Sequence, residues 1–357
     1  MTSTSEILHE YLVDLAAQDQ FSGVVRVTRG EHEIFADAYG FASRAWKVPN
    51  TLATRFDTAS ITKLFTAIAV LQQVDAGRLA LTTRAVEYLN LGDTAISSEV
   101  NIHHLLTHSS GIADDADEEA GEDYADLWIN KPNYSVTTAR NFLPQFIHKP
   151  ANFPPGQGCR YCNCGYILLG LMLEKASGMD YRDYVRQYIF TPTGMTNSGF
   201  FHMAEVSENV AEGVDPIRDA QGRITGWRKN IYSYPPIGTP DGGAHVTAVD
   251  LDRFLRAVKN GELLSPESTR YFFTPQILHS QQKGWKEMYG PGLWFYVEGD
   301  GSTLFYEKDG HNAGVSGMIR HYPGRDTSVV LLSNLGNGAW DPARKIHKMI
   351  IEGQFDN

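Results

Sequence analysis

The sequence predicts an α/β (α+β) protein, in which an antiparallel sheet is flanked by N- and C-terminal helices and interrupted by an all-helical region. Strand patterns occur near both ends of the chain, whereas helical periodicity dominates residues 63–190. We therefore expect residues 1–57 and 200–357 to form one discontinuous α/β domain and residues 58–199 to form a mainly helical domain. A binding cleft is expected between the two.

The first elements are a helix and a hairpin. Residues 1–18 place apolar side chains on one helical face, and residues 23–28 and 33–39 read as two strands joined by a polar turn at Gly30. The apolar face of the helix consists of Ile7, Leu8, Tyr11, Leu12 and Leu15.

The middle third predicts helices over residues 64–76, 138–148, 166–176 and 181–189, with Gly77 and Gly178 ending two of them. Strands return at residues 292–297, 303–308, 314–322 and 327–333, and a last helix covers 341–351. Residues 154–158 and 235–243 are rich in Pro and Gly and predict loops near the cleft.

Composition limits the partners. The chain has 357 residues, 42% of them hydrophobic, which is enough for a full core. The net charge of -11 is concentrated in one run that predicts a solvated loop, and no basic stripe offsets it, which argues against a nucleic-acid partner. The run comprises Asp114, Asp115, Asp117, Glu118, Glu119, Glu122, Asp123 and Asp126.

We find neither a secretory signal nor a membrane-spanning segment in the sequence. The N-terminal helix lacks the basic region and cleavage site of a secretory signal, and no stretch has the ~18 apolar residues of a membrane span. We expect no membrane partner and a cytoplasmic location, or a periplasmic or secreted one if the sequence is a trimmed mature form. The pattern says nothing of oligomeric state.

The three cysteines, Cys159, Cys162 and Cys164, suggest a metal site at first sight. Zinc sites commonly use two separated ligand pairs, and no complementary pair stands out, because His104 and His108 belong to a run better explained as a helix end. We therefore predict neither a metal nor another cofactor.

Ser60 and Lys63 stand where a short turn leads into an apolar helical run. Residues three apart share a helical face, so the Ser60 hydroxyl and the Lys63 amine are expected to meet in the first turn. The simpler alternative is a helix cap, but a capping box would place Glu or Gln where Lys63 stands, and a cation opposes the helix dipole there.

This pair predicts a serine nucleophile with a lysine base. For the lysine to act as a base near neutral pH, its pKa must fall by about three units from about 10.4, which costs roughly 4 kcal/mol. Burial lowers the pKa of a lysine. Backbone NH groups at the same helix start can hold an oxyanion. A second Ser-x-x-Lys copy at residues 280–283 is followed by Gly284 and has no apolar helix after it.

The motifs around Ser60-Ile61-Thr62-Lys63 resemble those of the serine β-lactamase and penicillin-binding-protein family, nearly from end to end. The branch with class C β-lactamases, DD-peptidases and family VIII esterases fits best, which implies a β-lactamase/transpeptidase-like fold. The other matching motifs are Phe21-Ser22-Gly23-Val24-Val25, Leu105-Leu106-Thr107-His108-Ser109-Ser110-Gly111, Gly165-Tyr166-Ile167-Leu168-Leu169-Gly170 and Gly242-Gly243-Ala244.

The family's Tyr-x-Asn element matches Tyr161-Cys162-Asn163, which we prefer to a copy at residues 88–90 that follows the Ser60 helix too closely. The resemblance implies that Tyr161 relays protons between Ser60, Lys63 and the leaving group, provided that Lys63 lowers the phenol pKa. Asn163 is expected to hydrogen-bond Lys63 and the acyl side of the substrate.

The third element, Lys-Thr-Gly or His-x-Gly, is assigned to His311-Asn312-Ala313-Gly314, with His311 catalytic and Asn312 and Gly314 binding substrate. The resemblance places an oxyanion NH after the triplet, at Gly314, and Ala313 departs from the family glycine. Lys259-Asn260-Gly261 has matching letters but is better explained as a helix end.

The sequence thus predicts a serine hydrolase that forms an acyl-enzyme with a small ester, amide or peptide. A histidine is mostly neutral at pH 7, so His311 in place of a lysine favours esterase or D-peptidase activity over β-lactam hydrolysis. Two alternatives remain, namely a penicillin-binding DD-peptidase or β-lactamase, and a catalytically silent relative that binds a ligand.

Overall fold

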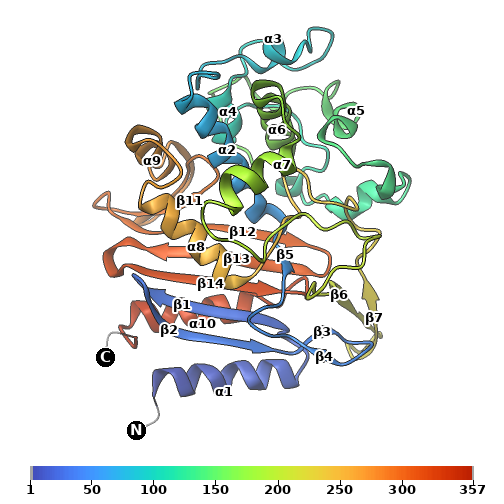
Figure 1. The fold of residues 1–357 in the computed structure, drawn as a ribbon, viewed down its shortest axis with the longest axis vertical. Helices are drawn as coiled ribbons and strands as arrows, with labels where there is room; N and C mark the ends of the chain where they lie inside the picture. Colours follow the sequence, from blue (N-terminus) through green and yellow to red (C-terminus); the bar gives the residue numbers. More distant parts are fainter. Residues whose placement is uncertain (1–2, 356–357) are drawn as a thin grey trace.

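The computed structural model describes residues 3–355 and centres on one eight-stranded antiparallel sheet (Figure 1). Its strand order is β2-β1-β14-β13-β12-β11-β10-β9, so strands from the two ends of the chain meet at the β1–β14 pair. These strands are β1 (Gly23–Arg29), β2 (His32–Tyr39), β9 (Ile277–Gln282), β10 (Trp285–Tyr289), β11 (Trp294–Glu298), β12 (Thr303–Asn312), β13 (Val315–Tyr322) and β14 (Thr327–Ser333).

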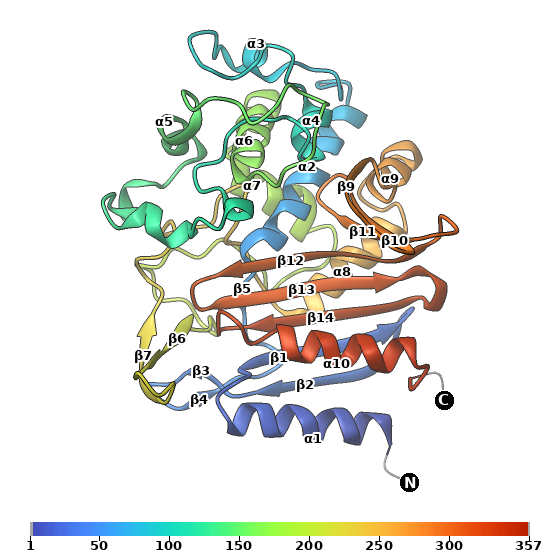
Figure 2. The same cartoon turned by 180° about the vertical axis from the view of Figure 1, so that it is seen from behind.

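The two faces of the sheet are covered by different helices because side chains alternate along each strand. Val25 and Leu331 face a core built with α1 (Thr4–Ala17) and α10 (Trp340–Ile351). In Figure 2, α10 lies in front of the sheet and α1 lies below β2. Val24 and Leu332 face the opposite core, which includes α8 (Ala248–Lys259) and the helical region. The central strands β1 and β14 are therefore buried on both sides.

The helical region is built around α2 (Lys63–Asp75) and α6 (Asn163–Ser177), which are almost entirely buried. Shorter helices surround this pair above the sheet (Figure 1). They are α3 (Ala85–Leu89), α4 (Ile102–Leu106), α5 (Leu143–Phe146), α7 (Tyr181–Val185), which continues into a π-helical turn at Arg186–Phe190, and α9 (Pro266–Phe272).

The mixed architecture predicted from the sequence is confirmed, while several bounds differ. Residues 1 and 2 of the predicted first helix lie outside the described residues, and Ser3 begins α1 with a capping box to Glu6. The helix predicted over 138–148 is a 3₁₀ turn at Ala139–Phe142 followed by α5. The division into two domains stays a prediction.

Eight strands of the described chain were not predicted, and four of them have five or six residues. Strands β9 and β10 extend the sheet at its outer edge, where exposed polar side chains blur the alternation. Strands β6 (Val214–Arg218) and β7 (Ile224–Lys229) form a hairpin where no element was predicted. The second Ser-x-x-Lys copy begins in β9, so Ser280 starts no helix. The other four are short: β3 (Phe41–Ser43), β4 (Val48–Pro49), β5 (Phe56–Asp57) and β8 (His245–Val246).

None of the helices between residues 3 and 355 combines the length and the apolar character that a bilayer span requires.

A glycine inside α6 tests the packing of this core. A Cβ at Gly170 would lie 2.1 Å from Cγ of Pro240, so we expect Gly170→Ala to lower the free energy of unfolding by about 1–3 kcal/mol. Urea denaturation measures this loss. Gly92→Ala is the matched control because a Cβ there meets nothing within 4 Å, and equal stability of the two variants would contradict the close α6–loop contact.

Candidate active site

Ser60 lies on a strained turn at the junction of the sheet and the helical region. Strand β5 (Phe56–Asp57) leads into a 3₁₀ turn, η1 (Ala59–Thr62), and α2 starts at Lys63. Ala59 has a φ of 41°, which is unusual for a residue with a side chain, and its NH donates to Oδ1 of Asp57 at 2.7 Å. The Ser60 NH has no hydrogen-bond partner among residues 3–355, so it is available to a ligand.

The predicted contact between Ser60 and Lys63 is present. Nζ of Lys63 donates to Oγ of Ser60 at 3.0 Å, to Oδ1 of Asn163 at 2.7 Å and to the carbonyl of Asp241 at 2.6 Å. The side chain is fully buried, and these three acceptors use all the protons of an ammonium group. The amine is therefore fixed beside the hydroxyl.

Burial lowers the pKa of Lys63 to about 8, and the nearby positive charge of Lys308 adds to this effect. The carboxylates of Asp241, Glu118 and Asp114 act in the opposite direction and limit the shift. A group with such a pKa can accept a proton near neutral pH, as general-base catalysis requires.

Tyr161 completes the polar contacts of Ser60. Its hydroxyl donates to Oγ of Ser60 at 2.7 Å, and Nζ of Lys63 and Nζ of Lys308 lie 5.1 Å and 4.9 Å from the centre of its ring. Burial, together with the negative charge of Glu118, raises the phenol pKa well above its usual value. The condition that Lys63 lowers this pKa was therefore wrong, and the phenol keeps its proton.

Asn163 lies at the first turn of α6 and connects the amine to the acidic loop. Its Oδ1 accepts from Lys63, and its Nδ2 donates to Oε1 of Glu118 at 2.8 Å. Its backbone NH and that of Cys164 donate to the two carboxylate oxygens of Asp114, each at 2.8 Å. A carboxylate at a helix N-terminus satisfies NH groups that have no intrahelical partner.

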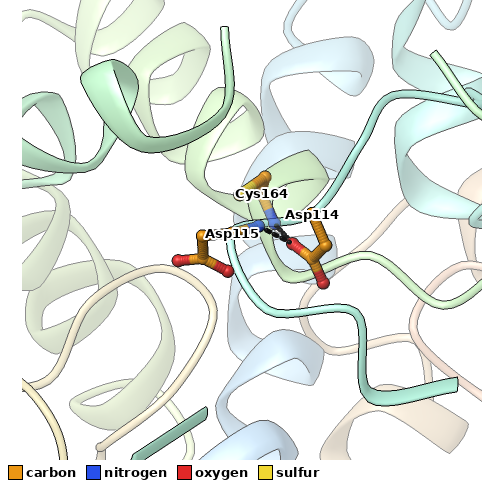
Figure 3. Close-up of side chains that lie close together, drawn as sticks. All are labelled: Asp114, Asp115 and Cys164. Atoms are coloured by element: carbon orange, nitrogen blue, oxygen red, sulfur yellow. Dashed lines mark hydrogen bonds between the residues drawn. The ribbon is translucent and has the colours of Figure 1, made fainter. Parts of the chain in front are cut away.

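The acidic run is only partly the solvated loop that was predicted. Asp114 and Asp115 are buried, and burial raises the pKa of both carboxyls. With Cys164 they form a cluster whose ligand atoms lie within 4.8 Å of one another (Figure 3). Hydrogen bonds from backbone NH groups already explain the placement of both carboxylates, since Oδ1 of Asp115 accepts from Ala116.

The end of β12 forms the other wall of the site. A Cβ at Gly310 would lie 2.2 Å from the carbonyl oxygen of Thr58 and 3.0 Å from the Ser60 nitrogen, so the strand runs directly against the Ser60 turn. Two residues earlier on the same face lies Lys308, which is 2% exposed and borders the same cleft as Ser60 and Tyr161. Lys308-Asp309-Gly310 therefore occupies the place expected for the third motif.

The structure favours Lys308 over His311 for the first position of this motif, although His311 borders the cleft at Ser60 and its catalytic role stays a prediction. Strand alternation turns the His311 side chain away from the face of Gly310, and its ring centre lies 6.2 Å from that of Trp340 in α10, across the sheet. The oxyanion role of Gly314 was wrong, because its NH donates to Oδ2 of Asp215 at 2.6 Å. Asn312 lines the cleft, and its role in binding substrate stays a prediction.

Prediction missed Lys308 and Gly310 because the strand was expected to end at residue 308, whereas β12 continues to Asn312. The available signal was the Lys-x-Gly spacing directly before His311.

The cleft at Ser60 has two lobes. One lies beside Asn163 and the loop around Tyr234–Gly243, and the other lies beside Tyr161 and β12. The residues that border the Asn163 lobe include Asp57, Ser60, Glu118, Tyr124, Asn163, Tyr234, Asp241, His311 and Asn312. The Tyr161 lobe is bordered by Ser60, Glu118, Glu119, Tyr161, His279, Tyr289, Trp294, Lys308, Asp309, Gly310 and His311.

A sequence model described as Beta-lactamase matches residues 8–353, which is nearly the whole chain. The protein belongs to the Beta-lactamase family. The family resemblance inferred from the motifs is thus confirmed.

Proteins similar to this chain include penicillin-binding proteins and an esterase. Penicillin-binding protein 4* of Bacillus subtilis is 25% identical over 335 residues, covering 90% of this chain and 69% of that protein. Esterase EstB of Burkholderia gladioli is 29% identical over 270 residues, covering 69% of this chain and 67% of that protein. The crystal structure of a penicillin-binding protein from Bacillus halodurans matches with a TM-score of 0.86 and 38% identity, covering 96% of this chain and 99% of that one.

The pKa of Lys63 gives an expected pH dependence. Only the neutral amine can accept the Ser60 proton, so kcat/KM for an uncharged ester is expected to rise with pH, with a midpoint at about 8. Initial rates between pH 5 and pH 10 on an ester without ionisable groups measure this profile. A rate that falls as pH rises through this range would contradict Lys63 as the base.

Proposed function

We propose that the protein is a serine hydrolase that cleaves a small ester, amide or peptide through an acyl-enzyme. The observation that carries this proposal is the hydrogen-bonded group in which Ser60 Oγ accepts from both Lys63 and Tyr161. A nucleophile in contact with a base of lowered pKa is the arrangement that covalent catalysis requires.

In the first step, Ser60 Oγ attacks the carbonyl carbon and its proton passes to neutral Lys63. The oxyanion is held by the NH of Ser60 and by the NH of His311, the residue that follows the Lys308–Gly310 triplet. The bond to the leaving group then breaks as Tyr161 donates its proton to that group and recovers one from the Lys63 ammonium. Water releases the acid from the acyl-enzyme in the second step.

The substrate arrangement follows from the position of the proton donor. Because Tyr161 protonates the leaving group, the Tyr161 lobe would hold the leaving group, and the Asn163 lobe would hold the acyl group. The acyl lobe is bordered by the carboxylates of Asp57, Glu118 and Asp241, and among residues 3–355 no lysine or arginine lines it. An uncharged or positively charged acyl group suits this lobe better than an anionic one.

Penicillin-binding or β-lactamase activity is a second candidate, and Lys308 is the observation that favours it. The preference for esters rested partly on a neutral histidine at this position, whereas a buried lysine stands there and could attract a substrate carboxylate. Asp309 opposes this, because its Oδ1 lies 3.3 Å from Nζ of Lys308 and partly neutralises it.

Removal of the nucleophile tests the main proposal. We expect Ser60→Ala to lower turnover of p-nitrophenyl esters by at least ~1000-fold and to abolish labelling by a fluorophosphonate probe. Ser280→Ala is the matched control, since Ser280 belongs to the other Ser-x-x-Lys copy and donates to Glu287 in the sheet. Folded wild-type protein without turnover or labelling would instead support a silent ligand-binding relative.

Asp309 tests the second candidate. Loss of its charge should strengthen the attraction between Lys308 and an anionic substrate, so we expect Asp309→Asn to raise kcat/KM for nitrocefin about 2- to 5-fold relative to a neutral ester. Asp326→Asn is the control, because Asp326 pairs with Lys259 outside the cleft. A ratio that is the same in both variants would show that Asp309 does not select against anionic substrates.

A further inference from the structure

His108 is a buried histidine directly behind Tyr161 that takes no part in the steps proposed above. It is 2% exposed and follows α4, with a backbone φ of 56° that few residues with a side chain adopt. Its ring centre lies 4.7 Å from that of Tyr161, with an angle of 33° between the planes, and 4.7 Å from that of Tyr289. The Tyr161 ring, whose hydroxyl bonds Ser60, therefore packs against the imidazole of His108.

Two hydrogen bonds connect His108 to the residues on either side of Tyr161. The NH of Arg160 donates to the carbonyl of His108 at 3.0 Å, and the NH of Cys162 donates to its Nδ1 at 3.1 Å. Residues 158–162 belong to no helix or strand, so no regular backbone ladder holds this segment. His108 therefore supplies two of the hydrogen bonds that hold this segment, in addition to the ion pair between Arg160 and Asp117.

The imidazole of His108 is in the neutral form that its hydrogen bond with Cys162 requires. Nδ1 must be unprotonated to accept from Cys162, and burial together with Lys308, Lys63 and His279 lowers the imidazole pKa well below its usual value. The imidazole is accordingly neutral at physiological pH and adds no charge beside the two lysines. The third NH of the segment, that of Tyr161, donates to Oε1 of Glu119 at 2.7 Å.

We propose that His108 is a positioning residue that holds the Tyr161 phenol in line with Ser60 and the leaving group. This proposal rests on the proposed function, in which Tyr161 is the proton donor. A phenol that is free to swing away from Ser60 would still leave the Ser60–Lys63 pair intact. The loss should therefore appear in leaving-group protonation and not in nucleophilic attack.

Leaving groups of different basicity separate these two steps. p-Nitrophenolate departs without a proton, whereas an alkoxide needs one, and a positioned general acid contributes roughly 100-fold or more to such a step. An alkyl ester and a p-nitrophenyl ester with the same acyl group therefore report on Tyr161 and on Ser60 respectively.

The experiment compares His108→Leu with His108→Asn on this pair of esters. Leucine removes the Nδ1 acceptor, whereas asparagine offers Oδ1 to the Cys162 NH and tolerates a positive φ. We expect His108→Leu to lower kcat/KM about 10- to 100-fold for the alkyl ester and less than about 3-fold for the p-nitrophenyl ester. His108→Asn should keep both values within about 3-fold of wild type.

Tyr161→Phe supplies the coupling test. In that background, His108→Leu should cause no further change in the ratio of the two esters, because the phenol is already absent. If His108→Leu does not fold, His108→Gly replaces it under the same criterion, since glycine adopts a positive φ without strain.

Equal losses on both esters, or an unchanged ratio, would overturn the proposal. If the proposed function itself is wrong, the result is different: the Ser60→Ala variant turns over the esters as fast as the wild-type protein.

Discussion

The buried amine of Lys63 is the constraint on which the rest of the site depends. Its three acceptors come from segments far apart in the sequence: the Ser60 turn, the first residue of α6, and the loop that carries Asp241. A buried ammonium is costly unless all its protons are bonded, so the fold must bring these segments together before the amine can be accommodated. The same contacts that satisfy the amine also align it with Ser60 Oγ.

Burial divides the proton chemistry between two neighbouring groups. Loss of solvent disfavours the charged form of each, which lowers the pKa of a lysine and raises that of a tyrosine. Lys63 is thereby moved toward the role of base, and Tyr161 toward that of a phenol that keeps its proton until a more basic leaving group takes it. One physical cause thus produces an acid and a base around a single hydroxyl.

The sequence predicted those parts of the site that depend on local spacing or on a recognisable motif. The three-residue interval from Ser60 to Lys63 places both side chains on one helical face, where they meet, and the family resemblance located Tyr161 and Asn163. The third motif was misplaced because its identity depends on where β12 ends and on which strand face meets the Ser60 turn. Both are fixed by non-local contacts, such as that of Gly310 with Thr58, which no local pattern reveals.

The acidic run shows why composition alone misled. Eight carboxylates in a short segment are typical of a solvated loop, yet Asp114 is buried at the start of α6 and Glu118 accepts from Asn163 beside the amine. The negative charges of Asp241, Glu118 and Asp114 raise the pKa of Lys63, against burial and Lys308, and the resulting value is about 8. A lysine of much lower pKa would be a weaker base, because basicity falls with pKa. The acidic loop therefore contributes to the strength of the base, together with Asp241, and it also helps to position Asn163.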